Sequence, residues 1–334
     1  MRTKFLFIIF FIFISSGTFS QTLHLTVFDT ANSKIPSNII KTLAIDAQDN
    51  IWFVTGDCFY GGVLVKYNGN SFQVFDSTNS GIRDRFVTCV AFDSNNVKWI
   101  GTRYTGLYRF DDKHWTNYNP SNSLLPDKHI NCIIIDRDQM IWMGTDKGLA
   151  IFDGKDWMIF NKENSLLPDN TVNSIAFDKF NSVWIATDQG ILTCFQIDII
   201  RKNNPLTKTM SSYSIYNKGN SKLGDNYVSQ IVIDKNNTKW ISYWGGVIKA
   251  NDESWTAFTP DNSGLPAYCE YTLTPDDKIL WVASNLGLVK YDGTIWNLYS
   301  PRNSLIPGFF INRVALDSKG NKWIASQSGL LMLK

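Results

Sequence analysis

Histidine and paired cysteines are scarce in this sequence of 334 residues. It has three histidines, His24, His114 and His129, and its five cysteines include no Cys-x-x-Cys pair. Zinc sites are typically built from four such side chains at characteristic spacings, so we expect no metal and no cofactor. Basic and acidic residues nearly balance, at 32 and 30. The chain therefore lacks the strong positive field of a nucleic-acid-binding protein, and we expect no nucleic-acid partner.

Long apolar runs are also missing, apart from one short run at the N-terminus. Residues 5–14 are all apolar, follow Arg2 and Lys4, and precede small polar residues up to Ser20. Ten apolar residues are too few to span a bilayer but are typical of a signal peptide. We interpret residues 1–20 as this signal peptide and expect residues 21–334 to form one monomeric domain without a transmembrane segment. The protein is then periplasmic or secreted.

The number of cysteines is odd, and they are widely spaced for an exported protein. They lie at positions 58, 89, 132, 194 and 269. A disulfide would need Cα atoms within about 7 Å of each other. Buried free thiols are favoured, because cysteine packs as a small apolar side chain.

A tryptophan recurs seven times at the same place in a repeating phrase. The intervals are 41 to 56 residues, and each tryptophan follows an apolar run that ends in Asp or Pro-Asp and a short polar turn; the seven are Trp52, Trp99, Trp142, Trp184, Trp240, Trp281 and Trp323. A period of this length made of short strands is the signature of a β-propeller. Since every repeat carries the tryptophan, we interpret it as packing between blades rather than as a sugar platform. The Asp-rich turns do not match a calcium loop, so we expect hairpin turns there.

The third repeat illustrates the four strands expected in each blade. They span residues 130–135, 140–145, 149–152 and 157–160, and the corresponding outer strands begin at Phe72, Trp115, Trp157, Tyr213, Trp255 and Trp296. We expect the innermost strand to be buried on both faces because it is apolar throughout. The long interval before Trp240 is explained by an insertion at residues 197–212 in the fourth repeat.

The seventh repeat ends after its third strand, and its outer strand is expected at the other end of the chain. Residues 25–28, followed by the segment up to Pro36, match residues 115–118 and the segment up to Pro126. The fold class is therefore all-β: a seven-bladed propeller of four-stranded antiparallel blades, in which the N-terminal strand completes blade 7. Closing the ring in this way removes two exposed sheet edges.

These repeats resemble the two-component regulator propeller family. The third repeat shows the family phrase in Trp142-Met143-Gly144-Thr145, Gly148-Leu149, Phe152-Asp153-Gly154 and Trp157. Such propellers commonly form the periplasmic sensor part of hybrid histidine kinases, so the resemblance implies a role in sensing. It implies no kinase activity, because the sequence contains one propeller and no kinase domain.

Ligand-binding residues are expected where the repeats differ, at the mouth of the central channel. Loops entering each innermost strand and loops between the second and third strands should share this face, which is rich in aromatic residues. The candidate binding residues are Phe59, Tyr60, Phe86, Arg103, Tyr104, His129, Tyr227, Tyr243, Trp244, Tyr268 and Phe310. A concave mouth with aromatic walls and a few polar groups is a typical binding site.

Three functions are compatible with this sequence. The favoured one is an exported binding propeller that recognises an oligosaccharide, a peptide or an envelope protein. The second is a lyase or hydrolase that uses carboxylates and His129 at the channel mouth. The third is an envelope scaffold. No assembled acid–base set is visible in the sequence, so an enzyme is disfavoured.

Overall fold

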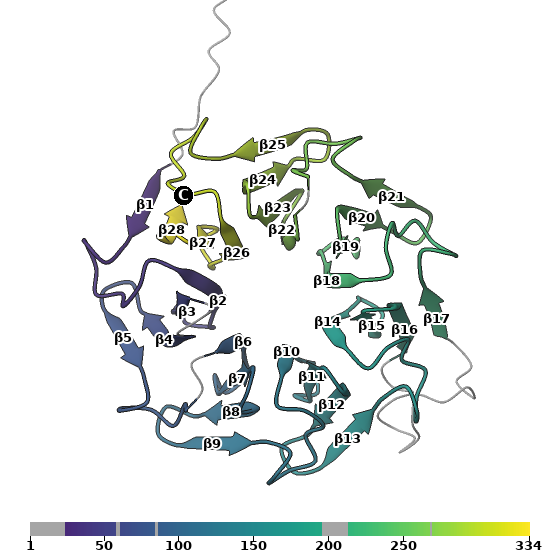
Figure 1. Ribbon diagram of the computed structural model, residues 1–334, viewed down its shortest axis with the longest axis horizontal. Coiled ribbons are helices and arrows are strands. Elements are labelled where there is room, and N and C mark those ends of the chain that lie inside the picture. Colours follow the sequence, from purple (N-terminus) through teal and green to yellow (C-terminus); the bar gives the residue numbers. More distant parts are fainter. Residues whose placement is uncertain (1–23, 58–60, 84–85, 196–212, 268) are drawn as a thin grey trace, which may run out of the picture.

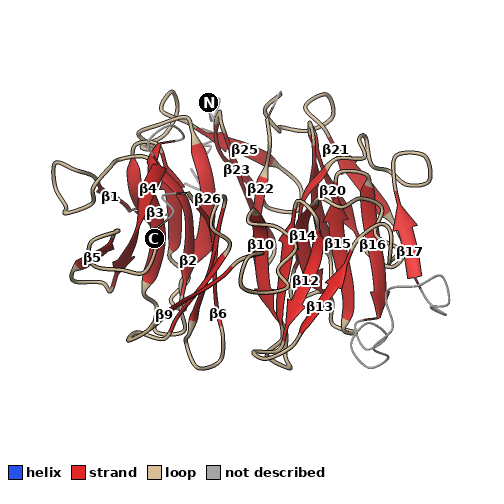
Figure 2. Cartoon of the chain, turned by 60° about the horizontal axis from the view of Figure 1, so that its bottom comes forward, coloured by secondary structure: helices blue, strands red, loops and turns tan. Residues whose placement is uncertain are grey.

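The computed structural model describes residues 24–57, 61–83, 86–195, 213–267 and 269–334. These residues form seven four-stranded antiparallel sheets arranged around a central axis (Figure 1), with no helix among them. In the tilted view of Figure 2, the sheets stand next to one another around the ring. The predicted all-β, seven-bladed propeller is confirmed. The predicted signal peptide and the insertion at residues 197–212 lie outside the described residues.

Each blade is numbered by its innermost strand, so that blade 1 begins with β2 and blade 7 with β26. The innermost strands are β2 (Ile40–Ile45), β6 (Val87–Phe92), β10 (Ile130–Ile135), β14 (Val172–Phe177), β18 (Val228–Ile233), β22 (Thr272–Asp276) and β26 (Ile311–Leu316). The second strands are β3 (Ile51–Asp57), β7 (Lys98–Thr102), β11 (Ile141–Thr145), β15 (Ser182–Thr187), β19 (Lys239–Tyr243), β23 (Ile279–Ser284) and β27 (Lys322–Ser326).

The outer half of each blade consists of two further strands. The third strands are β4 (Gly61–Tyr67), β8 (Leu107–Phe110), β12 (Gly148–Phe152), β16 (Gly190–Phe195), β20 (Gly246–Ala250), β24 (Gly287–Tyr291) and β28 (Gly329–Leu333). The outer strands are β5 (Phe72–Phe75), β9 (Trp115–Tyr118), β13 (Trp157–Phe160), β17 (Tyr213–Tyr216), β21 (Trp255–Phe258), β25 (Trp296–Tyr299) and β1 (Leu25–Phe28). All six predicted first residues of the outer strands of blades 1 to 6 are confirmed.

The N-terminal strand closes the ring as predicted. β1 pairs antiparallel with β28, with Leu25 opposite Leu333 and Phe28 opposite Leu330. The Phe28 ring stacks on Trp323 of blade 7 at a centroid distance of 6.0 Å, and it also contacts Tyr67 of blade 1 at 5.2 Å. The first strand of the chain therefore joins the last blade to the first.

The seven repeated tryptophans lie between the blades, and their exposure ranges from 0% to 8%. Trp142 of blade 3 packs in one cluster with Ile175 and Ile185 of blade 4, and its indole nitrogen donates a 2.8 Å hydrogen bond to Asp136. Trp323 packs in the same way against Ile40 of blade 1. Their role as packing residues between blades is confirmed.

The Asp-rich turns between the first two strands are held by their own carboxylates. Asp136 accepts hydrogen bonds from the backbone N–H groups of Asp138 and Met140, both at 2.9 Å. In the equivalent turn of blade 7, burial opposes the ionisation of Asp317. Hydrogen bonds from Asn321 and Trp323 outweigh that effect and hold the Asp317 pKa below its ordinary value. The turn chemistry is therefore that of an Asx turn, as predicted.

A glycine begins most third strands because the backbone turns sharply there. Gly148 has a φ of +127°, and a Cβ atom at this position would lie 2.2 Å from the Phe160 carbonyl oxygen. Any other residue would meet both a strained backbone and a clash. The Gly-Leu step of the repeat therefore reflects the close approach of the third and outer strands.

The burial expected for the innermost strands was wrong. In blade 3, all five residues of β11 are buried, whereas in β10 only Ile130 is buried and the other five residues are partly exposed. The innermost strands line the channel, whereas the second and third strands lie inside the blade, and all five residues of β12 are buried as well. A continuous apolar run in the sequence therefore does not distinguish an innermost strand from a strand in the middle of a blade.

Candidate functional site

The two kinds of loops expected at the channel mouth do lie at one end of the blades. Because neighbouring strands run antiparallel, the connections between second and third strands leave each sheet at the same end as the connections between blades. We call this end the loop face. In blade 3, Nδ1 of His129, just before β10, lies 2.8 Å from Oδ2 of Asp146, in the turn between β11 and β12. This contact joins the two kinds of loops.

Three predicted residues present exposed aromatic rings on the loop face. Tyr104 and Trp244 are each 53% exposed, and Phe310 is 46% exposed. The Tyr104 ring meets Phe86 edge to face at 5.2 Å, and the guanidinium carbon of Arg103 lies 5.6 Å from its centroid. Blade 2 therefore carries a compact aromatic and cationic group, while Trp244 and Phe310 lie on blades 5 and 7.

Trp244 lines a cavity of about 480 Å³ on the loop face. Its polar walls include Lys41, Glu270, Asn285 and Asn312, so residues of blades 5, 6, 7 and 1 meet there. An exposed indole ring offers a flat apolar surface, and the surrounding ammonium, carboxylate and amide groups supply hydrogen-bond donors and acceptors. This arrangement suits a ligand with both apolar faces and polar edges.

Two of these polar residues reach the cavity because their strands bulge. The pairing of β2 with β3 shifts between Ile40 and Thr42, and that of β26 with β27 shifts between Ile311 and Arg313. The extra residue at each bulge is Lys41 or Asn312. β-Bulges commonly re-aim a side chain next to a binding site.

The same bulge recurs on other innermost strands and links the blades. The side chains of Thr88, Asn131 and Asn173 donate to backbone carbonyls of the following blade at 2.5, 3.2 and 3.0 Å. Asn312 closes the ring with a 2.6 Å hydrogen bond to the carbonyl of Ile40. These hydrogen bonds hold the rim of the channel in place, so the mouth is preorganised.

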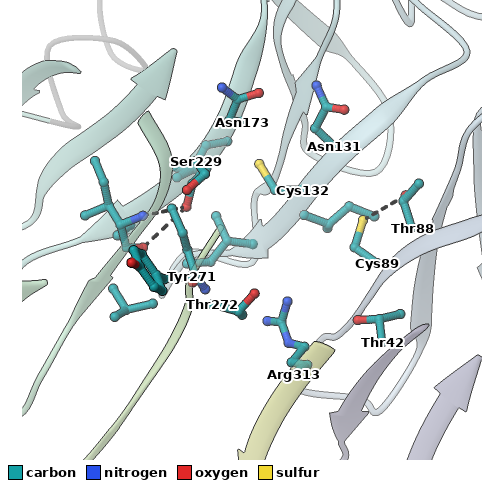
Figure 3. Close-up of a pocket in the computed structure, with 18 of the residues that line it drawn as sticks. Thr42, Thr88, Cys89, Asn131, Cys132, Asn173, Ser229, Tyr271, Thr272 and Arg313 are labelled. Carbon is teal, nitrogen blue, oxygen red and sulfur yellow. Dashed lines mark hydrogen bonds between the residues drawn. The ribbon is translucent and has the colours of Figure 1, made fainter. Parts of the chain in front are cut away.

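The cavity beside Trp244 continues into the central channel, since Glu270 and Thr272 line both. The channel encloses about 600 Å³ and is lined by the innermost strands of all seven blades (Figure 3). One level of the channel is set by the register, because each of its residues pairs with the residue two positions after the blade's tryptophan. The seven residues at this level are Thr42, Cys89, Cys132, Ser174, Gln230, Thr272 and Arg313.

The remaining polar candidates occupy different sectors of the loop face. Asp146 accepts hydrogen bonds from both His129 and Asn131, the latter at 2.9 Å. Burial raises the pKa of Tyr227, and the nearby carboxylates of Glu270 and Asp188 raise it further. His129 and Glu270 lie on blades 3 and 6, and no contact joins them within the described parts of the chain.

Tyr243 lies in the protein core, whereas its neighbour Trp244 is exposed. Tyr243 is 4% exposed and packs in a cluster with Leu223 and Ile248. It ends strand β19, and Trp244 begins the following turn, so the two side chains point in opposite directions. We therefore leave Tyr243 out of the site. Phe59, Tyr60 and Tyr268 lie outside the described residues.

Sequence reasoning did not select Lys41, Asn312 or Arg313. Each is a polar residue at the second or third position of an innermost strand whose first and fourth to sixth positions are apolar. A polar residue at this position could indicate a channel-lining side chain, because the innermost strands contact the channel there. The sequence alone does not show this, since it does not reveal that the strands surround a cavity.

Across the residues that the structure describes, no group of three or more His, Cys, Asp or Glu side chains is arranged to hold a metal ion. The same residues contain no helix long and apolar enough to cross a membrane. Cys89, Cys132 and Cys269 are free thiols, as predicted, and Cys58 is outside the described residues.

Cys89 and Cys132 should react slowly in the native protein. Burial raises the pKa of Cys89 to about 11 and that of Cys132 to about 12. A raised pKa means less thiolate at pH 8, about 100-fold less for Cys89 than for an ordinary cysteine of pKa 9.0. Iodoacetamide labelling followed by peptide mass spectrometry should show this difference between the native and the urea-unfolded chain. Equal labelling rates in the two states would contradict the burial of these thiols.

Two stretches of the sequence match a known protein family. Residues 124–147 and 166–189 match the Two component regulator propeller family. Each stretch runs from a loop between blades through the first two strands to the next turn on the loop face. The family resemblance seen in the sequence is confirmed in these repeats. No curated protein matches the sequence.

Several solved structures share the fold at low sequence identity. The extracellular domain described for the hybrid two component system BT3049 of B. thetaiotaomicron has a TM-score of 0.74 and 19% identity, over 92% of this chain and 40% of that one. PorZ, a surface component of the type-IX secretion system of Porphyromonas gingivalis, has a TM-score of 0.69 and 16% identity, over 91% and 48%. Virginiamycin B lyase from Staphylococcus aureus has a TM-score of 0.70 and 12% identity, over 93% and 99%.

These likenesses concern the fold, since the identities are low. The chain spans 40% of the BT3049 domain and 48% of PorZ. The three relatives are described as a sensor-system domain, a secretion component and a lyase, so one propeller plan supports three kinds of function. The function of this chain has to be argued from its own site.

Proposed function

We propose that this protein is an exported binding propeller that recognises an oligosaccharide at the loop face and acts in extracytoplasmic sensing. The cavity beside Trp244 carries this proposal. Its exposed indole can stack on the apolar face of a sugar ring, while Lys41, Glu270 and Asn285 can hydrogen-bond the hydroxyl groups at the ring edge. A peptide or an envelope protein is the alternative ligand.

Three further observations support export and sensing. The N-terminal sequence has the pattern of a signal peptide, with an apolar run of ten residues and small residues before Gln21. Two stretches match the regulator propeller family. A relative of the same fold is described as the extracellular domain of a two component system. Binding at a preorganised rim, rather than turnover, fits a sensory role.

Replacing Trp244 with alanine should abolish most of the ligand binding. Truncating a central aromatic residue commonly costs about 2 kcal/mol or more, which is about 30-fold in affinity. Glycan and peptide arrays would identify a ligand for the chain starting at Gln21, and titration calorimetry would then measure its affinity for Trp244→Ala. Since Trp244 is 53% exposed, the substitution should leave the fold intact.

The matched control is Phe180→Ala. Phe180 is 58% exposed and lies in the turn between β14 and β15, at the end of the blades opposite to the loop face. Its removal should leave binding unchanged. A ligand whose affinity is the same in both variants would place the binding site elsewhere. Capture of an envelope protein, with no array ligand, would favour the scaffold.

The pair formed by His129 and Asp146 keeps a lyase as the second candidate. A histidine whose Nδ1 lies 2.8 Å from a carboxylate oxygen is held in one orientation, as a general base requires. A lyase with this fold is among the similar structures. Turnover of a bound ligand that disappears in His129→Ala, but persists in His114→Ala, would support this candidate over simple binding.

A further inference from the structure

Arg313 is a cation in the central channel with no partner of its own. It is the third residue of β26, lines the channel, and its guanidinium group points into the cavity (Figure 3). Among the residues that the structure describes, no hydrogen bond or ion pair reaches this group. Burial lowers the pKa of Arg313 from its ordinary value, yet a guanidinium stays charged at neutral pH.

The groups around Arg313 do not neutralise it. The ionisable groups that act on it are the thiols of Cys89 and Cys132, whose high pKa values keep them uncharged at pH 7. Glu270 is the one carboxylate among the described residues that line the channel, and it lies at the end shared with the Trp244 cavity. Arg313 is partly exposed to the channel, and a charged group that has lost part of its hydration and has no partner favours an anionic ligand group there.

Two hydroxyl groups flank the guanidinium. Thr42 and Thr272 occupy the same level of the channel as Arg313, on the two neighbouring blades, and Figure 3 shows both directed toward it. By contrast, the hydroxyl group of Thr274, two residues after Thr272, is used within the protein, because it donates a 2.8 Å hydrogen bond to the Val314 carbonyl. The hydroxyl groups of Thr42 and Thr272 can therefore hydrogen-bond a ligand that binds to Arg313.

We propose that Arg313, Thr42 and Thr272 form a carboxylate-binding site inside the channel, which receives the acidic group of a uronic acid residue. A planar guanidinium matches a carboxylate through two parallel hydrogen bonds. A single positive charge suits a monoanion better than a phosphate dianion. That the anionic ligand is a sugar rests on the proposed function. The two sites are connected, because Thr272 lines both the channel and the Trp244 cavity.

The test compares glucuronate, acetate, glucose and inorganic phosphate at constant ionic strength, with chloride as the reference anion. Titration by ligand-observed NMR should show binding of glucuronate to the native chain and weaker binding of acetate. Arg313→Met should weaken glucuronate binding about 10-fold or more, since a hydrogen bond to a charged group is lost. Arg313→Lys, which keeps the charge without the planar fork, should be intermediate.

Two controls separate this site from the mouth of the channel. Trp244→Ala should leave acetate binding unchanged, whereas Arg313→Met should remove it. Arg313→Met should also unfold at the same or a higher denaturant concentration than the wild type in chloride, because an unpaired charge is lost. Phosphate binding tighter than glucuronate, or equal acetate binding by the wild type and Arg313→Met, would overturn the proposal. Neither result would affect binding of a neutral oligosaccharide beside Trp244.

Discussion

Replacing Trp142 with alanine is expected to lower the free energy of unfolding by about 3–5 kcal/mol. The Trp142 side chain is fully buried between blades 3 and 4, meets Phe177 edge to face at 5.2 Å, and hydrogen-bonds Asp136. Truncation to alanine removes this packing and leaves a large cavity between two blades. Denaturant unfolding followed by circular dichroism would measure the loss as a shift of the midpoint.

A comparison with Trp184 separates the hydrogen bond from the packing. Trp184 occupies the same position in blade 4 and is 8% exposed, but its indole nitrogen has no hydrogen-bond partner among the described residues. Trp142→Phe should therefore be more destabilising than Trp184→Phe by about 1.5–3 kcal/mol, the usual contribution of a hydrogen bond to a charged group. Equal losses would show that the bond to Asp136 contributes little.

Removing β1 should have a still larger effect, because it reopens the ring. The strand supplies the whole ladder against β28, and its Phe28 ring packs against Trp323 and Phe72. Without it, the edge of β28 is exposed and blades 7 and 1 lose their shared contacts. A chain that begins at Thr30 should unfold at a much lower denaturant concentration and aggregate at concentrations where the native protein is soluble.

The control for this truncation is the chain that begins at Gln21, the expected mature form. It retains Leu25 to Phe28 and should show the full stability of the ring. Size-exclusion chromatography and thermal unfolding of the two chains side by side would measure the difference. A chain starting at Thr30 with an unchanged midpoint would mean that β28 needs no partner, and the closure would then be structurally neutral.

Much of the fold was predictable because its signals are local. The Asp turn, the tryptophan and the Gly-Leu step recur in most repeats, so the register of each blade follows from neighbouring residues. The predicted start of β13 at Trp157 and the pairing of Leu25–Phe28 with the last blade both depend on such matches. The burial of β10 was not predictable in this way, since its apolar sequence is compatible with one covered face or two.

The candidate site was predictable only in part, because side-chain direction at a strand end depends on the backbone around it. Tyr243 and Trp244 are adjacent aromatic residues, yet one is 4% and the other 53% exposed. The bulges that aim Lys41 and Asn312 toward the mouth recur in most blades, but the bulged residue varies: it is lysine in blade 1, threonine in blade 2 and asparagine in blades 3, 4 and 7. No repeated phrase marks them.

Repetition along the chain thus specified the number of blades and their strands, because these depend on contacts between residues that are near in sequence. It also specified the closure at Leu25–Phe28, because this segment matches the outer strand of the other repeats. The convergence of Thr42, Thr272 and Arg313 depended instead on closing the ring, which brings residues from both ends of the chain to one level of the channel. Their side chains meet because β2, β22 and β26 share one register around the axis. That relation exists only in three dimensions.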